Sequence, residues 1–347
     1  YHSSPHAVNF VSVVQQRPIG LTPPPFQTHV RISEASPFKS LERSHTMAKI
    51  VLKHPKGSSV ELLLYGATIL SWKSPSAGDS TPTERLFVSS TAFLDGSKPV
   101  RGGVPVVFPC FGAPAHPEHM KLSQHGFARN SIWLWDQVTK EEDGRVAVTL
   151  TLEPTEAIRS IYERPFHLTF EVSLGEYDLS TELHVKNTAT ATDSTPNYLE
   201  FQALFHNYIL VAPADVGDVR VTPLQNLTYF DKTEATDEGK ATGKIESRAG
   251  VDVKKFTDSV YQDAPQNYEI TWPGSGIAIK TTNLKDVVVW NPQAEAGSKI
   301  GDMEKGGWEK FICCEPGQVR GFAKVAPGMT WSGKQVMSVI QHARRHQ

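Results

Sequence analysis

Short segments of alternating apolar and polar residues run through most of this chain, and they constrain its fold more than any other feature. Val146–Leu152, Leu168–Leu174 and Thr181–Asn187 alternate residue by residue, which places the apolar side chains on one face of an extended strand. Clusters of Gly, Pro, Asn and Asp separate such segments, as they do in antiparallel sheets. Further strands are expected at Ser59–Gly66, Leu199–Val211, Gly276–Thr282, Val287–Asn291 and Phe311–Cys314.

Helical periodicity is weak throughout. Ser90–Leu94 and Val336–Ala343 are predicted to be short helices at most, and the polar stretch Asp231–Gly250 is predicted to be a long loop. Many strands without intervening helices predict an all-β fold, a large antiparallel β-sandwich with few short helices. Because sandwiches of this size often form one unit, residues 47–347 are expected to make a single domain.

Residues 1–46 differ from the remainder in composition. Their first acidic residue is Glu34, and Pro23–Pro25 lies in a Ser- and Pro-containing stretch with weak periodicity. The pattern faintly resembles an organellar transit peptide but lacks an amphipathic, Arg-rich stretch. We therefore expect a poorly ordered or surface-wrapped extension, with the patterned body beginning at Met47.

Charge and cysteine content argue against several classes of function. The 347 residues carry 35 Lys plus Arg against 37 Asp plus Glu, so no domain-wide basic field exists to hold nucleic acid. No apolar run approaches the ~20 residues that span a bilayer, so a membrane protein is not expected. Cys110, Cys313 and Cys314 make a poor disulfide framework and lack zinc-site spacing, which favours a reducing, cytoplasmic location.

Two arginines lie in segments rich in Gly, Pro and aromatic residues. Arg101 belongs to Lys98–Gly112, and Arg129 belongs to Gln124–Asn130. A guanidinium held in rigid turns suits bidentate binding of a carboxylate or phosphate. An arginine that bonds nearby carbonyls within a turn is an equally good interpretation from the residues alone.

His206 lies in an aromatic run where a histidine is either buried with a partner or lines a pocket. If this run is a strand, His206 shares a face with Leu204 and Tyr208, while Phe205 and Asn207 point to the other face. A satisfied core histidine is the commoner of the two situations.

Glu315 follows an apolar run and precedes a Pro-Gly turn, so its carboxylate either reaches the mouth of a sheet or caps a turn. His125, beside Gly126, is a candidate hydrogen-bonding group for a substrate. Asp231 is a loop acceptor whose alternative is an Asx-turn. Nucleophile-elbow, dinucleotide, phosphate-loop and metal motifs are missing. The set therefore favours acid–base chemistry on a phosphorylated or carboxylated small molecule, with no metal and no cofactor.

Taken in order, several segments resemble the aldose 1-epimerase superfamily, and within it the glucose-6-phosphate 1-epimerase branch in its fungal form. The matching segments are Tyr65–Trp72, Asp95–Pro105, Gln124–Asn130, Leu204–Tyr208, Asp286–Pro292 and Cys314–Gly317. The resemblance implies a galactose mutarotase-like β-sandwich with a sugar site on a concave face. It also implies an enzyme that interconverts the α and β anomers of a hexose 6-phosphate, glucose 6-phosphate foremost, and we expect a monomer.

Roles follow from the same motifs. His206 resembles the general acid of the family and Glu315 its general base, and ordinary pKa values of about 6.5 and 4.3 would suit both at neutral pH. Arg101, Gln124 and Arg129 resemble the residues that bind the sugar phosphate. Asp231 resembles a substrate-binding aspartate, and His125 matches a histidine that lines the substrate site.

Two other functions stay open: a non-catalytic carbohydrate-binding sandwich, and a mutarotase of unphosphorylated aldoses. The chain also departs from the family pattern at Cys110, Gln293 and Ile300–Asp302, and these departures bear on the choice of sugar.

Overall fold

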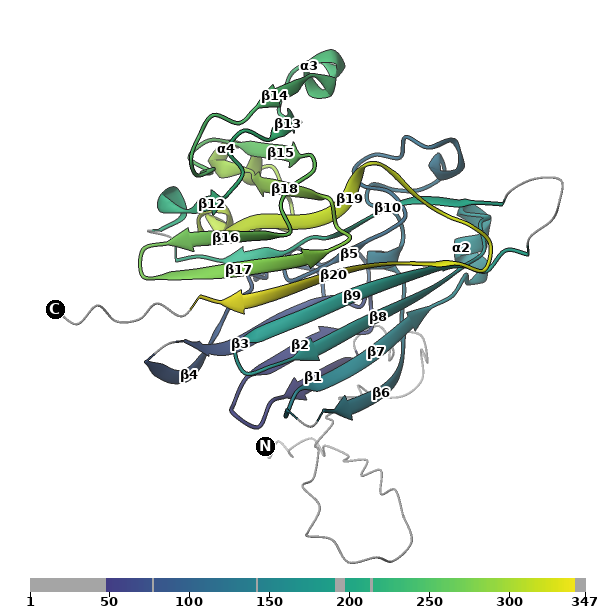
Figure 1. The fold of residues 1–347 in the computed structure, drawn as a ribbon, viewed down its shortest axis with the longest axis horizontal. Coiled ribbons are helices and arrows are strands. Elements are labelled where there is room, and N and C mark those ends of the chain that lie inside the picture. The colour runs from purple at the N-terminus through teal and green to yellow at the C-terminus, as the bar shows by residue number, and fades with distance from the viewer. Residues whose placement is uncertain (1–47, 77, 142, 191–196, 213–214, 341–347) are drawn as a thin grey trace, which may run out of the picture.

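The computed structural model describes residues 48–76, 78–141, 143–190, 197–212 and 215–340. The expected extension, residues 1–46, lies outside the described residues. The strands form one four-stranded sheet (sheet A) and two eight-stranded sheets (sheets B and C), and the named strands pair antiparallel (Figure 1). This architecture confirms the predicted all-β sandwich.

Sheet A has the order β1-β2-β3-β4. Its strands are β1 (Lys49–Lys53), β2 (Ser59–Leu63), β3 (Ile69–Ser76) and β4 (Asp79–Glu84). Sheet B has the order β14-β13-β15-β18-β19-β10-β5, with β11 also paired to β19. Its strands are β5 (Val106–Val107), β10 (Leu199–Phe205), β11 (Tyr208–Leu210), β13 (Thr228–Asp231), β14 (Gly243–Ile245), β15 (Thr257–Tyr261), β18 (Asp286–Asn291) and β19 (Phe311–Val325).

Sheet C has the order β12-β16-β17-β20-β9-β8-β7-β6. Its strands are β6 (Leu134–Lys140), β7 (Val146–Leu152), β8 (Phe166–Leu174), β9 (Asp178–Asn187), β12 (Arg220–Thr222), β16 (Asn267–Trp272), β17 (Ser275–Thr282) and β20 (Thr330–Val339). Short helices connect the strands: α2 (Glu156–Ile161), α3 (Asp237–Ala241), α4 (Gln293–Gly297), η1 (Pro117–His119), η2 (Ala128–Asn130), η3 (Val216–Asp218) and η4 (Gly307–Lys310).

The main core draws buried side chains from all three sheets. In β7, buried and partly exposed residues alternate strictly, because every second side chain of a strand points to the same face. Phe170 of β8 contacts Phe205 of β10 with their ring centroids 6.0 Å apart, and Phe201 of β10 lies 5.3 Å from Trp331 of β20. These aromatic contacts hold sheets B and C face to face.

The central strand β19 is buried on both faces from Phe311 to Gly317. One face meets the core, and the other carries two further apolar clusters beneath surrounding loops. Leu204, Phe230 and Val288 belong to one of these clusters, and Tyr208 and Cys313 belong to the other. A polar side chain on this second face is therefore shielded from solvent by apolar neighbours.

Three local predictions are wrong. The segment 90–94 contains a turn and no helix. Val336 lies in β20, where alternating burial and pairing with both β9 and β17 impose an extended backbone; residues 341–343 of the same prediction lie outside the described residues. The predicted loop 231–250 contains α3 and β14, and α3 is capped by Thr236, whose side chain accepts from the amide of Gly239.

The three cysteines are free and buried. Among the described residues, no helix has both the length and the apolar character needed to cross a membrane.

Candidate active site

His206, which lies between β10 and β11, is opposite Glu315 of β19 in sheet B. The register pairs Leu204 with Gly317 and Tyr208 with Cys313, so the positions between them bring His206 face to face with Glu315. The distance from His206 Nδ1 to Glu315 Oε1 is 3.4 Å. The two residues are 8% and 1% exposed. Two predicted functional groups, more than a hundred residues apart in sequence, thus meet in one buried place.

Aromatic side chains hold the imidazole of His206. Its ring stacks on Tyr208 with centroids 4.8 Å apart and an interplanar angle of 8°, and Trp290 of β18 meets it edge-on at 6.0 Å. Phe205 and Asn207 point to the opposite face, into the core, where Asn207 bonds Gln335. The alternation predicted for this segment is confirmed.

Burial changes the pKa of both groups. It raises the pKa of the Glu315 carboxyl well above its usual range, and the nearby carboxylate of Asp258 adds to this effect. Burial also lowers the pKa of His206 well below its usual range, helped by the charges of Arg129 and Arg101. The expectation of ordinary pKa values is therefore wrong, because low polarity disfavours the charged form of each group. The surroundings thus favour the neutral form of both groups.

The pair also has unused hydrogen-bonding capacity. His206 Nδ1 and Glu315 Oε2 have no hydrogen-bond partner among the described residues. Buried polar atoms normally find partners because an unsatisfied one is costly. The pair therefore keeps hydrogen-bonding positions that no described residue fills.

Arg101 lies at the Tyr208 end of this arrangement. Its Nε donates to Asp302 Oδ1 at 3.0 Å, and its Nη1 donates to Tyr208 Oη at 3.2 Å. The interaction with Tyr208, together with Asp302, raises the pKa of the guanidinium. Asp302, at the end of the Ile300–Asp302 segment, therefore orients the Arg101 side chain.

The segment that carries Arg129 is folded tightly against Phe108. His125 and Gly126 both adopt positive φ angles of 67° and 70°, and a Cβ on Gly126 would lie 2.2 Å from the carbonyl oxygen of Phe108. Gly112 donates its amide to His125 Nδ1 at 3.1 Å, while His125 donates its own amide to Gly112 O at 2.9 Å. Only glycine at position 126 permits this close approach.

Arg129 has no carboxylate partner among the described residues. Its Nη2 donates to the Gln124 carbonyl at 2.9 Å, and its Nε is buried without a hydrogen-bond partner. Burial, assisted by the repulsion of Arg101, lowers the pKa of Arg129 to about 10. Two guanidinium groups near each other, one of them without a counter-ion, form a site that favours an anion.

His125 connects the Arg129 segment to the acid–base pair. Its ring lies 5.8 Å from that of His206, and burial lowers its pKa well below the usual range. Since Nδ1 accepts from Gly112, the neutral ring carries its proton on Nε2. The side-chain amide of Gln124 lies 3.3 Å from that Nε2, and the Gln124 residue is otherwise exposed.

Asp231 is the one predicted site residue whose carboxylate is used by its own loop. It accepts from Thr233 N and Thr233 Oγ1 at 3.0 and 2.6 Å, and from Lys244 Nζ at 3.2 Å. This is the Asx-turn that the sequence left as its alternative. The acidic residue that lies near Glu315 across sheet B is instead Asp258, through the pairing of β15 with β18 and of β18 with β19.

Asp258 and Lys232 were missed by the sequence analysis. Lys232 N donates to Asp258 O at 2.8 Å, and Asp258 is paired with Trp290, which is paired with Cys313. These residues form a row across sheet B, next to the row that contains Glu315. The ammonium of Lys232 lies 4.3 Å from the centre of the Phe111 ring. Asp231 and Lys232 are adjacent in sequence, and strand alternation alone could have indicated that only one of them faces the site.

Two clusters among the described residues could bring donor atoms onto a metal ion. The donor atoms of His206, Cys313 and Glu315 lie within 4.8 Å of one another, as do those of a surface group, Glu171, Glu182 and His184. At the first cluster, burial raises the pKa of the Cys313 thiol, and cationic side chains surround the pair. Both effects oppose binding of a cation there.

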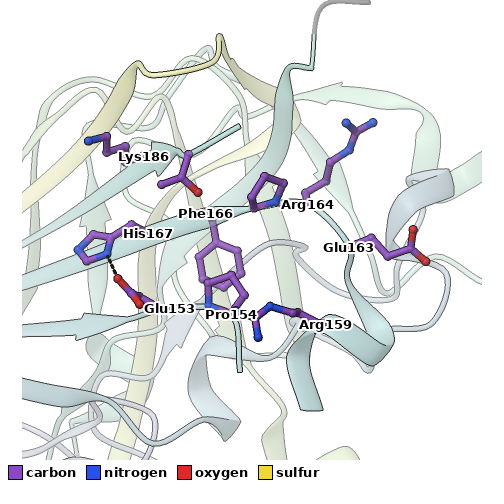
Figure 2. Close-up of a pocket in the computed structure, with 10 residues that line it drawn as sticks. Glu153, Pro154, Arg159, Glu163, Arg164, Phe166, His167 and Lys186 are labelled. Atoms are coloured by element: carbon purple, nitrogen blue, oxygen red, sulfur yellow. Dashed lines mark hydrogen bonds and ion pairs between the residues drawn. The ribbon is translucent and has the colours of Figure 1, made fainter. Parts of the chain in front are cut away.

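A separate cleft lies between β7, α2, β8 and β9 (Figure 2). Glu153 bonds His167 across it at 3.1 Å, and Arg164 forms an ion pair with Glu118. None of the seven predicted site residues lines this cleft. Its charged groups are largely paired and exposed, so it lacks the buried, unpartnered groups found around His206.

The comparisons with known proteins agree with this geometry. The family model described as aldose 1-epimerase matches residues 48–338. The chain belongs to the aldose 1-epimerase family. A protein of Cenchrus ciliaris that carries the provisional name glucose-6-phosphate 1-epimerase is 30% identical over 316 residues, which cover 88% of this chain and 89% of the relative. A relative from Salmonella typhimurium with the same provisional name is 28% identical over 82% of this chain and 87% of its own length.

Solved structures support the fold. A mutarotase-like crystal structure from Salmonella typhimurium superimposes with a TM-score of 0.72 at 24% identity, covering 85% of this chain and 91% of its own. A galactose mutarotase-like protein from Clostridium acetobutylicum gives a TM-score of 0.65 at 15% identity, covering 90% and 99%. This aldose 1-epimerase family member is therefore an isomerase of the sugar-mutarotase type, whose substrate is a small sugar.

Proposed function

We propose that this aldose 1-epimerase family member interconverts the α and β anomers of a hexose 6-phosphate, with glucose 6-phosphate as the preferred substrate. The observation that carries the proposal is the pair Arg101 and Arg129 beside His206 and Glu315. Arg129 has no described carboxylate partner, and both guanidinium charges lower the pKa of His206. An uncharged sugar would give the Arg129 guanidinium no negative charge to pair with.

The order of the groups matches the order of the atoms in the substrate. In a hexopyranose 6-phosphate, C6 is attached to C5, which is bonded to the ring oxygen, which is bonded to C1. Along sheet B, Arg101 contacts Tyr208, Tyr208 stacks on His206, and His206 faces Glu315. A phosphate at the arginines thus leaves the ring oxygen near His206 and the C1 hydroxyl near Glu315.

In the proposed reaction Glu315, as carboxylate, takes the proton of the C1 hydroxyl while His206, as imidazolium, gives a proton to the ring oxygen. The bond between C1 and the ring oxygen breaks, and C1 becomes the aldehyde. Rotation about C1–C2 and attack of the C5 hydroxyl on the other face of the carbonyl reverse both proton transfers. One proton leaves His206 as another reaches Glu315, so the pair keeps the same number of protons through ring opening and reclosure.

The free-aldose mutarotase and the non-catalytic sugar-binding sandwich are the alternatives. The unpaired Arg129 weighs against the first, and the facing acid–base pair weighs against the second. As further parts of the proposal, Asp258 and Lys232 contact sugar hydroxyl groups beyond C1, and the working protein is a monomer.

The test follows freshly dissolved α-glucose 6-phosphate by NMR or polarimetry. The wild-type protein should bring it to anomeric equilibrium faster than buffer alone, and Glu315→Gln and His206→Asn should not. Equilibration at the buffer rate with wild-type protein overturns the proposal. Equal rates for glucose 6-phosphate and free glucose favour the free-aldose alternative, and binding without anomerisation favours the sugar-binding module.

A further inference from the structure

The backbone around His206 departs from a regular ladder. The amide of Asn207 donates to Phe205 O at 3.0 Å, which closes a three-residue γ-turn with His206 at its centre. In a regular antiparallel pair, Asn207 and Cys314 would exchange both of their backbone hydrogen bonds. One of these is present, from Cys314 N to Asn207 O at 3.3 Å. The other cannot form, because the Asn207 amide is already used in the turn.

The Asn207 side chain takes the place of the missing backbone donor. Its Nδ2 donates to Cys314 O at 2.9 Å, so the strand that carries Glu315 is still bonded to the segment that carries His206. Each bonded residue is the immediate neighbour of one member of the acid–base pair. The side chain of Asn207 therefore supplies one of the two bonds that hold the backbone beside His206 to the backbone beside Glu315.

Gln335 of β20 holds that side chain in turn. Asn207 Nδ2 donates to Gln335 Oε1 at 2.8 Å, and Gln335 Nε2 donates to Asn207 Oδ1 at 2.9 Å. Both residues are fully buried. Gln335 itself is anchored by backbone pairing with Thr281 and Thr181 of the neighbouring strands. A rigid strand of sheet C therefore fixes the orientation of an amide that belongs to sheet B.

We propose that Asn207 and Gln335 are positioning residues that hold His206 and Glu315 at their working separation from the core side of sheet B. The inference rests on the proposed acid–base roles of that pair. Neither residue reaches the site face, so neither is a catalytic residue. Their effect should fall on kcat more than on KM, because the substrate contacts themselves are unchanged.

The experiment compares Asn207→Leu and Gln335→Met with a matched control, Asn187→Leu. Asn187 is also a buried asparagine whose Nδ2 joins two backbone carbonyls, of Asn197 and Val325, and none of its contacts involves the site. All three variants lose buried hydrogen bonds. We expect kcat on glucose 6-phosphate to fall about tenfold to a hundredfold in the first two with KM little changed, and to stay near wild type in Asn187→Leu.

A conservative variant and a second readout separate positioning from general damage. Gln335→Glu keeps the length of the side chain and, buried and protonated, keeps both an acceptor and a donor for Asn207, so kcat should lie closer to wild type than in Gln335→Met. The titration of the His206 ring, followed by NMR, should shift in Asn207→Leu and Gln335→Met and stay unchanged in Asn187→Leu. This readout holds even if wild-type protein lacks anomerase activity, an outcome that would overturn the proposed function alone.

Wild-type kcat and an unshifted His206 titration in folded Gln335→Met overturn the positioning proposal. Equal losses of kcat in Asn207→Leu and Asn187→Leu overturn it as well, because activity would then follow stability. If Asn207→Leu does not fold, Gln335→Met and Gln335→Glu decide the question, since Asn207 keeps its bond to Cys314 in both.

Discussion

Arg101→Ala and Arg129→Ala should lower kcat/KM for glucose 6-phosphate to a similar extent. The two variants should differ in their free energy of unfolding. A charge-assisted hydrogen bond of the kind proposed for the 6-phosphate is worth about 1.5–3 kcal/mol. Loss of one such interaction lowers kcat/KM for glucose 6-phosphate about tenfold to a hundredfold. Activity on free glucose, which has no phosphate, should hardly change in either variant.

The difference in stability follows from the partners of each guanidinium. Arg101→Ala removes two hydrogen bonds and leaves Asp302, which is 9% exposed, without its cation. An unsatisfied buried group costs about 1–3 kcal/mol, so the free energy of unfolding should fall by roughly this amount. Arg129→Ala leaves no carboxylate unpaired, and it removes a buried charge whose pKa burial lowers to about 10. Its free energy of unfolding should be unchanged or higher.

Both quantities are measurable on the same preparations. Anomerisation of glucose 6-phosphate and of glucose is followed by NMR, and the free energy of unfolding is obtained from urea titration. Arg145→Ala is a suitable control, because Arg145 pairs with Asp178 at 2.7 Å and none of its described contacts involves the site. If both arginine variants lose activity on the two substrates equally while remaining folded, the arginines do not bind the phosphate and the reasoning fails.

Four further outcomes are expected. The pH profile of kcat/KM should be bell-shaped, because the His206–Glu315 pair works while holding one proton. The acid limb should lie below the ordinary histidine pKa of about 6.5, and the basic limb should lie above the ordinary glutamate pKa of about 4.3. An acid limb above 6.5 contradicts the lowered pKa of His206. The raised pKa of Glu315 means that this group binds more proton in the folded protein than in the unfolded chain above about 4.3. Its contribution to stability is therefore lost as pH rises through the folded-state pKa, while the lowered pKa values of His125 and His206 act in the opposite direction. Compared with wild type, Glu315→Gln should shift the change in unfolding free energy between pH 5 and pH 8, measured by urea titration, toward higher stability at pH 8; an identical change in both proteins would count against a buried carboxyl. Lys232→Met removes a positive charge that favours ionised Glu315, so the basic limb should move to higher pH. The control Lys254→Met, at an exposed position, should leave the profile in place; an unmoved limb in Lys232→Met would mean that Lys232 acts elsewhere. A chain beginning at Met47 should fold and keep its turnover, because the family match begins at residue 48, and loss of either would show that residues 1–46 contribute to the domain.

The sequence was enough to predict His206 and Glu315 as an acid–base pair. It was not enough to predict the residues that hold the two side chains in position. Strand alternation placed His206 on one face and Asn207 on the other, and motif resemblance gave both catalytic candidates. The role of Asn207 depends on a γ-turn and on Gln335, which lies 128 residues away. No local pattern encodes a contact across two sheets, so this part of the site could not be predicted.

The acidic residues near the site also show what the sequence alone could not predict. Resemblance selected Asp231, but its carboxylate is bonded to Thr233 and Lys244. Asp258 lies in the row beside Glu315 because three strands pair in a particular register. A shift of one residue in that register would turn it to the other face.

The sequence by itself determined the fold class, because period-two alternation and turn residues act over a few positions and leave antiparallel strands as the natural arrangement. It also determined which residue types were available for acid–base chemistry. Only the tertiary structure decided how the pKa values of those residues are shifted. Burial between apolar clusters raises the pKa of Glu315 and lowers that of His206, and the local polarity that does this is a property of packing among strands distant in sequence. The tertiary structure likewise decided that Arg101 is held by Asp302 while Arg129 has no carboxylate partner among the described residues, since ion pairs form between side chains that the sheets bring together in space.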